Sequence, residues 1–178
     1  MTNKRKLYLV VATLLACSNV AQAIECIDGK LVDVKGSVQT QNISSVYQVG
    51  LINLGLLDNT TVIYANSGSI AGTVTNQNAN SITLTHKIDF NPSGTDSIDT
   101  QGDHAILLMP PLKYDSNGSA CAFNVVESIT NFEGTGFFVG ANGYIVATGT
   151  VDFCQADQAS GAPDNTFDLT GQLCIKNN

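Results

Sequence analysis

The chain has 178 residues, with 15 acidic against 8 basic side chains and a formal net charge of −7 at pH 7. Three of the basic residues, Lys4, Arg5 and Lys6, lie in the leader described below, so the remainder contains no arginine. Such an acidic chain lacks the positive surface that phosphate backbones require, which excludes nucleic acid as an expected partner. The length is that of one domain.

The first 23 residues are typical of a secretory signal peptide. Basic residues near the start precede an apolar run at 7–16, and Ala21 and Ala23 form an Ala-x-Ala cleavage site. Neither this run nor any later segment has the length of a transmembrane helix. A second interpretation stays open, because the Leu-Leu-Ala-Cys sequence ending at Cys17 resembles a bacterial lipobox with a lipidated cysteine. Either route predicts an exported bacterial protein, secreted or periplasmic, with a single domain at 24–178.

Short runs rich in Val, Ile, Thr and Phe fill the rest of the chain, separated by turn signals such as Ser67-Gly68 and by polar loops at 91–101 and 155–165. This pattern predicts an all-β fold, an antiparallel β-barrel of about eight strands stapled by disulfides. The expected strands are 30–40, 45–57, 61–64, 69–75, 81–90, 103–109, 121–130, 144–153 and 166–175.

Two of these runs alternate strongly between apolar and polar residues. In the run at 81–90, the apolar face carries Ile82, Leu84, Ile88 and Phe90, and it also carries His86. The run at 166–175 alternates in the same way. Alternation with a period of two predicts strands with one buried face and one solvated face, as in antiparallel sheets.

The segment at 134–143 reads Gly-Thr-Gly-Phe-Phe-Val-Gly-Ala-Asn-Gly. It resembles the G-T-G-x-F-x-G-A-x-G stretch of the allene oxide cyclase and dirigent-like β-barrels, and the match covers about 30 residues. Its glycines suit a bend in a barrel strand, where Phe137 or Phe138 turns inward to fill the end of the barrel. The resemblance implies the barrel fold, and none of the family's catalytic residues can be placed on this chain.

Cys26, Cys121, Cys154 and Cys174 form an even set, which predicts two disulfides in an exported protein. Matching the apolar faces of 144–153 and 166–175 pairs Phe153 with Phe167 and places Cys174 opposite Val146, too far from Cys154 to bond with it. We expect Cys121 to pair with Cys154 and Cys26 with Cys174. The pairing of Cys26 with Cys154 stays open, because Cys121 and Cys154 lie on different strand faces unless a β-bulge intervenes.

His86 and Glu127 are the sharpest candidate site. Each shares a strand face with apolar residues, so both are expected to point into the barrel, where burial and mutual attraction perturb their pKa values. Together with Phe137 they are the expected ligand-pocket residues. The sequence assigns no catalytic residue firmly, and His86 and Glu127 are a hypothesis for general acid and base roles.

No metal site or cofactor is expected. The cysteines lack the close spacing of zinc ligands, and the loop that begins at Asp89 has Thr100 where a calcium-binding loop has a bidentate Glu. Asp96, Asp99 and Asp103 are expected to be solvated.

The leading interpretation of function is an exported, non-enzymatic barrel that binds a small apolar ligand. One alternative is an isomerase or cyclase that acts on an apolar substrate through His86 and Glu127. Another is a surface interaction module without a small-molecule site, which a barrel interior filled by side chains would favour. The sequence leaves the oligomeric state open.

Overall fold

The computed structural model describes residues 25–91, 94–154 and 163–176. The expected leader, Cys17 and most of the 155–165 loop lie outside the described residues. The chain forms ten strands and one short 3-10 helix, η1: β1 (Gly29–Ser44), β2 (Tyr47–Asp58), β3 (Thr61–Gln77), β4 (Ser81–Asp89), β5 (Ser97–Thr100), β6 (Asp103–Tyr114), β7 (Ala120–Ile129), β8 (Phe132–Gly134), η1 (Gly136–Phe138), β9 (Asn142–Asp152) and β10 (Asn165–Lys176).

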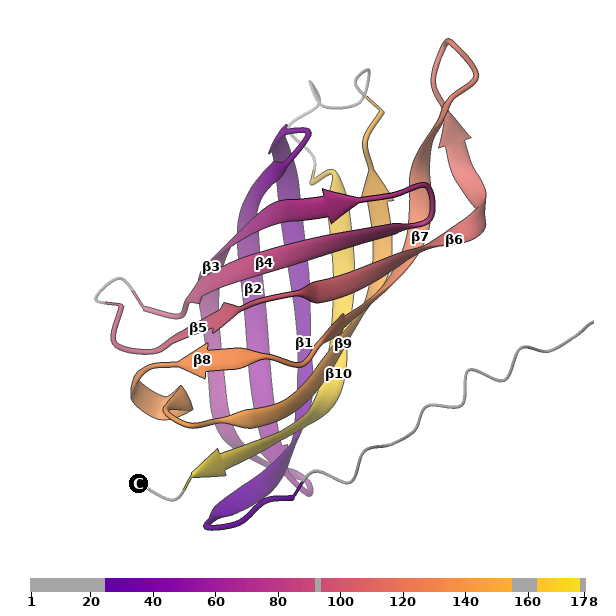
Figure 1. Ribbon diagram of the computed structural model, residues 1–178. Coiled ribbons are helices and arrows are strands. Elements are labelled where there is room, and N and C mark those ends of the chain that lie inside the picture. The colour runs from indigo at the N-terminus through magenta and orange to yellow at the C-terminus, as the bar shows by residue number, and fades with distance from the viewer. Residues whose placement is uncertain (1–24, 92–93, 155–162, 177–178) are drawn as a thin grey trace, which may run out of the picture.

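All ten strands belong to one antiparallel sheet, in the order β3-β2-β1-β10-β9-β7-β6-β4-β5-β8. An additional pairing between β3 and β4 joins eight of these strands into a closed ring, visible in Figure 1. The short strands β5 and β8 continue the sheet from β4. Among the described residues, no helix is long and apolar enough to cross a membrane.

The alternation read from the sequence determines which side chains point into the ring. Ile82, Leu84, His86 and Ile88 in β4 and Phe90 directly after it are all buried, whereas their neighbours along the chain are partly or fully exposed. The expected all-β antiparallel fold is therefore confirmed. The apolar side chains inside the ring form one continuous core.

Two expectations about chain breaks are wrong. The Ser67-Gly68 pair is not a turn, because β3 runs through it as a single strand. Gly68 is needed there for close approach, since a Cβ would lie 2.4 Å from the Asp89 carbonyl oxygen. The loop expected at 91–101 contains strand β5, and Ser97, Ile98 and Thr100 in it are buried.

The expected register between the last two long strands is also wrong, by four residues. Phe167 pairs with Gly149 rather than Phe153, and Cys174 pairs with Asn142 rather than Val146. Matching apolar faces determines only whether a residue points in or out, and a shift of four residues preserves both faces.

The disulfides Cys26–Cys174 and Cys121–Cys154 are the pairing we expected. No β-bulge is required, because Cys154 lies beyond the end of β9 and is free of that strand's alternation. Gly29 leaves room for the first bridge, since a Cβ at that position would lie 2.8 Å from the Sγ atom of Cys174. Two disulfides are typical of proteins in oxidising compartments outside the cytosol.

The glycine-rich segment at 134–143 turns the chain from β8 into β9 through η1. Gly136 and Gly140 have positive φ angles of 56° and 68°, a conformation that costs glycine little. Phe138 is completely buried and packs against Tyr64 and Phe90 at this end of the ring. Of the two phenylalanines, Phe138 therefore fills the end of the ring.

Removing either disulfide should destabilise the protein, and removal of Cys26–Cys174 should cost more. This bridge joins residues 148 apart in sequence, against 33 for Cys121–Cys154, and longer closed loops restrict the unfolded chain more. The losses in free energy of unfolding should be about 5 and about 4 kcal/mol. Urea unfolding of the two double Cys→Ser variants measures them, and the reverse order would contradict the prediction.

Candidate functional site

Three residues lie side by side across neighbouring strands on the inner face of the ring. Gly72 in β3 pairs with Gln48 in β2 on one side and with His86 in β4 on the other. A Cβ at position 72 would lie 2.8 Å from Nε2 of Gln48 and 3.1 Å from Cδ2 of His86. Glycine at this position therefore lets both polar side chains pack against the backbone of β3, because a Cβ there would collide with them.

His86 is held by Asp103 and Thr100, which flank a tight turn. Its Nδ1 donates to Oδ2 of Asp103 at 2.7 Å, and its backbone N–H donates to the Thr100 hydroxyl at 2.9 Å. The same hydroxyl donates to Oδ2 of Asp103. Gly102, with a φ angle of 73°, makes the turn that brings Thr100 and Asp103 together. The imidazole is thereby fixed in one orientation, with a proton on Nδ1.

Glu127 approaches the same imidazole from β7, which is separated from β4 by β6 alone. It lies in β7 between Ala105 of β6 and Ala147 of β9, two small residues that leave room for its side chain. Its Oε1 is 3.8 Å from Nδ1 of His86 and has no hydrogen-bond partner. His86, Asp103 and Glu127 are all at least nine-tenths buried, with 6%, 1% and 5% of their surface exposed.

Burial and mutual charge shift two pKa values in this cluster. Desolvation raises the pKa of Glu127 above 4.5, and the attraction of His86 only partly opposes it. For His86, burial alone would lower the pKa, but the hydrogen bond to Asp103 and the charges of both carboxylates raise it above 6.5. Relative to the free side chains, both shifts favour the protonated form of the group concerned, which is the neutral carboxyl group of Glu127 and the charged imidazole of His86.

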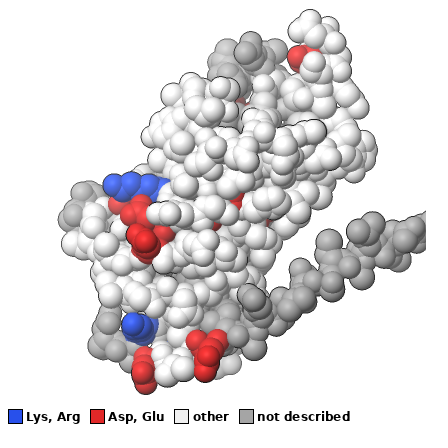
Figure 2. Space-filling view, viewed as in Figure 1, with Lys and Arg blue, Asp and Glu red and all other residues white. Residues whose placement is uncertain are grey.

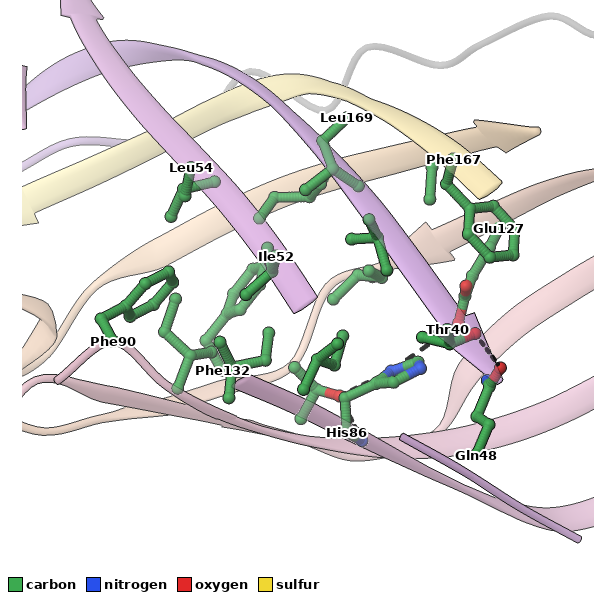
Figure 3. A pocket seen from close by; sticks show the side chains of 18 residues that line it. Thr40, Gln48, Ile52, Leu54, His86, Phe90, Glu127, Phe132, Phe167 and Leu169 are labelled. Carbon is green, nitrogen blue, oxygen red and sulfur yellow. Dashed lines mark hydrogen bonds and ion pairs between the residues drawn. The ribbon is translucent and has the colours of Figure 1, made fainter. Parts of the chain in front are cut away.

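The cluster lines a largely apolar cavity inside the ring. Figure 3 shows His86 and Glu127 at one end of it, with Phe90, Ile52 and Leu54 towards the other. The cavity is small, with about 30 Å³ open to the centre of a water molecule. That volume accommodates a few water molecules or the end of a ligand, not a whole drug-sized ligand.

A second inner cavity adjoins this one, and a groove at the open end of the ring adjoins the second. Gln48, Glu127 and Phe167 line both inner cavities. The second cavity and the groove share further residues, among them Ser45 in the β1–β2 turn and Phe153. The groove is much larger, at about 520 Å³, which is within the size range of ligand sites. The two inner cavities and the groove therefore adjoin one another, and Glu127 lines both inner cavities.

A buried network of uncharged polar side chains supports Gln48. Asn165, which is completely buried, accepts a hydrogen bond from the backbone N–H of Asp152 through Oδ1. Its Nδ2 donates to Oε1 of Gln48 at 2.9 Å, and the hydroxyl of Thr40 donates to the same oxygen at 2.8 Å. The carbonyl side of the Gln48 amide is therefore fully used by the protein.

His86, Asp103 and Glu127 are the group among the described residues that could hold a metal ion, since their ligand atoms lie within 4.8 Å of one another. One imidazole and two carboxylates suit several divalent ions. An ion at Nδ1 of His86 would have to displace the proton that this atom donates to Asp103. We therefore treat the cluster as a hydrogen-bonded acid and base site.

All four described cysteines are in disulfides, so none of them is available as a metal ligand.

The structure brings together two of the three expected pocket residues. His86 and Glu127 meet inside the ring, whereas Phe137 lies elsewhere, half-buried and stacked on Tyr64 with ring centroids 4.7 Å apart. Asp96 and Asp99 do not join Asp103. The expected solvation of Asp103 is wrong, because it is almost fully buried.

Sequence reasoning missed Asp103, Thr100 and Gln48 as site residues. Asp103 had a readable signal, because it alternates with Ala105 and Leu107 on the buried face of β6. Thr100 and Gln48 carry no such signal.

Charged groups are sparse on the face shown in Figure 2, where they gather over its lower half. Among the described residues that line the two inner cavities and the groove there is no lysine or arginine. Among these described lining residues, His86 is the only side chain that can carry a positive charge.

Comparison with models of protein families, with curated proteins and with solved structures finds no match to this chain. The geometry of the ring interior is therefore the basis of the functional argument.

Replacing Glu127 by Gln should flatten the dependence of stability on pH. Both shifted groups bind protons more readily in the folded state, so the free energy of unfolding should fall as pH rises above 4.5 for Glu127 and above 6.5 for His86. The slope is at most about 1.4 kcal/mol per pH unit for each proton. Urea unfolding across this range should show a shallower fall for Glu127→Gln. The exposed Glu133→Gln variant is the control, and a Glu127→Gln curve parallel to the wild type would contradict the prediction.

Asp103→Asn should lower the pKa of His86, because the hydrogen bond to Asp103 is the largest of the contributions that raise it. Titration of the imidazole signals by NMR measures this pKa, and the His104→Gln variant assigns the two histidines. Asp99→Asn changes an exposed carboxylate on β5 and should leave the His86 pKa in place. An unchanged pKa in Asp103→Asn would refute this account of the cluster.

Proposed function

We propose that the protein is an exported β-barrel that binds a small apolar molecule, and that it is similar in architecture to the allene oxide cyclase and dirigent-like barrels. The closed ring of eight antiparallel strands and the glycine-rich bend before β9 support the architecture. The two disulfides support export, to the periplasm or the cell exterior.

The observation that carries the binding proposal is the set of adjoining cavities, which share lining residues from the groove inward. A groove of ligand size leads through apolar walls to a few convergent polar groups, among them a carboxyl group with a raised pKa. This combination is the usual character of a small-molecule site. The body of the ligand would lie in the groove, and one end of it would reach inward to Glu127.

Ser45→Trp should weaken binding by at least about tenfold, or ~1.4 kcal/mol, because the indole would fill the groove where it meets the inner cavity. Ser45 is exposed in a turn, so the change should leave the ring intact. Equilibrium dialysis with 2-ethylnaphthalene, a neutral hydrocarbon, measures the affinity. The control is Ser128→Trp, which adds the same bulk to an exposed position on β7.

Equal affinity in the two tryptophan variants would place the ligand outside the groove. No binding of apolar probes by the wild type would overturn the proposal and favour a surface interaction module instead.

A second candidate function is isomerisation by proton transfer, favoured by the His86–Asp103 hydrogen bond. A carboxylate that fixes one imidazole nitrogen leaves the other to exchange a proton with a bound molecule. Such a site would catalyse exchange of the acidic C–H protons of cyclohexanone with deuterium oxide. Proton NMR should then show exchange that is lost in His86→Gln and retained in His104→Gln. Exchange at the same rate in both variants would remove His86 from this role.

A further inference from the structure

The orientation of the Gln48 amide follows from its neighbours. The backbone N–H of Asp152 can only donate, so the Asn165 atom that it meets is the oxygen, and Nδ2 of Asn165 is a donor. This Nδ2 and the Thr40 hydroxyl both contact Oε1 of Gln48. The other end of the Gln48 amide is therefore its Nε2 group, which can act only as a hydrogen-bond donor.

Gln48 presents this Nε2 group beside the inner cavities. The residue lines both of them, and its Nε2 packs over Gly72 from one side as Cδ2 of His86 does from the other. Among the described residues, Nε2 of Gln48 has no hydrogen-bond partner. It is thus a donor held in position by a buried network and left unused by the protein.

Glu127 supplies a second donor to the same two cavities. It lines both inner cavities together with Gln48, and its Oε1 has no partner although it is buried. Burial raises its pKa and favours the neutral carboxyl group, which carries one O–H donor. The polar end of the cavity therefore offers donors from two strands of the ring.

The charge around this space determines what kind of acceptor fits. Two buried acidic residues, Asp103 and Glu127, already face a single imidazole, and no lysine or arginine is among the described residues that line the cavities. A ligand carboxylate would add a further buried negative charge without a partner, which is costly. A carbonyl oxygen accepts two hydrogen bonds, carries no charge and adds no donor that would itself need a partner.

We propose that the interior of the ring selects apolar molecules that end in a neutral carbonyl group, with the carbonyl oxygen accepting hydrogen bonds from Gln48 and Glu127. The inference rests on the proposed binding function and gives the chemical class of its ligand. The small inner cavity suits a carbonyl group, and the larger groove accommodates the apolar remainder.

Three probes of matched shape test the inference by equilibrium dialysis with the full oxidised chain. They are 2-acetylnaphthalene, a ketone, 2-ethylnaphthalene, which lacks the carbonyl group, and 2-naphthoate, which is charged. The ketone should bind at least about tenfold more tightly than either of the others, as expected for hydrogen bonds to buried donors. The carbonyl stretching band of the bound ketone should shift to lower wavenumber than in hexane.

Variants connect the preference to the two donors. Gln48→Leu and Glu127→Leu should each reduce the preference for the ketone over the hydrocarbon and reverse part of the infrared shift. Glu127→Gln retains an N–H donor, so it should keep both the preference for the ketone and the infrared shift. Glu133→Leu, an exposed control, should behave as the wild type, and circular dichroism establishes that each variant is folded.

The outcomes separate this inference from the binding proposal. Equal binding of the ketone and the hydrocarbon would overturn the inference and leave apolar binding in place. Tightest binding of 2-naphthoate would overturn the neutral carbonyl as the ligand group. Absence of binding by all three probes would overturn both proposals.

Discussion

The pairing of β3 with β4 closes eight strands into a ring, and this closure governs every inward side chain. Inside a closed ring a polar group has little water to meet, so it must find a partner among the other inward residues. His86, Asp103 and Glu127 point inward from three different strands. Their meeting inside the ring follows from strand alternation on three successive strands, β4, β6 and β7.

Small residues contribute as much to the site as polar ones. Gly72 separates Gln48 from His86, and alanines on either side of Glu127 make room for its carboxyl group. Larger side chains at these positions would fill the spaces that the polar groups border. The shape of the inner cavities therefore depends on the small size of Gly72 and of the two alanines as well as on the polar residues.

Alternation along single strands is enough to predict the all-β fold and the inward direction of His86 and Glu127. It does not predict contacts between strands, since a period of two leaves the register undetermined by any even number of residues. The Thr100–Asp103 pair depends on a turn at Gly102 that the pattern does not specify. Gln48 depends on Asn165, more than 100 residues away in sequence, and no local signal joins the two.

The unused hydrogen-bonding capacity of the interior distinguishes a binding site from a packed core. A ring that needed only to stay folded would gain stability from an apolar residue at position 127, because a buried carboxyl group without a partner is costly. The chain instead keeps Glu127 there and lines the same two cavities with Gln48, and the second of these cavities adjoins the groove at the open end. A molecule that entered through the groove could therefore form hydrogen bonds with Gln48 and Glu127.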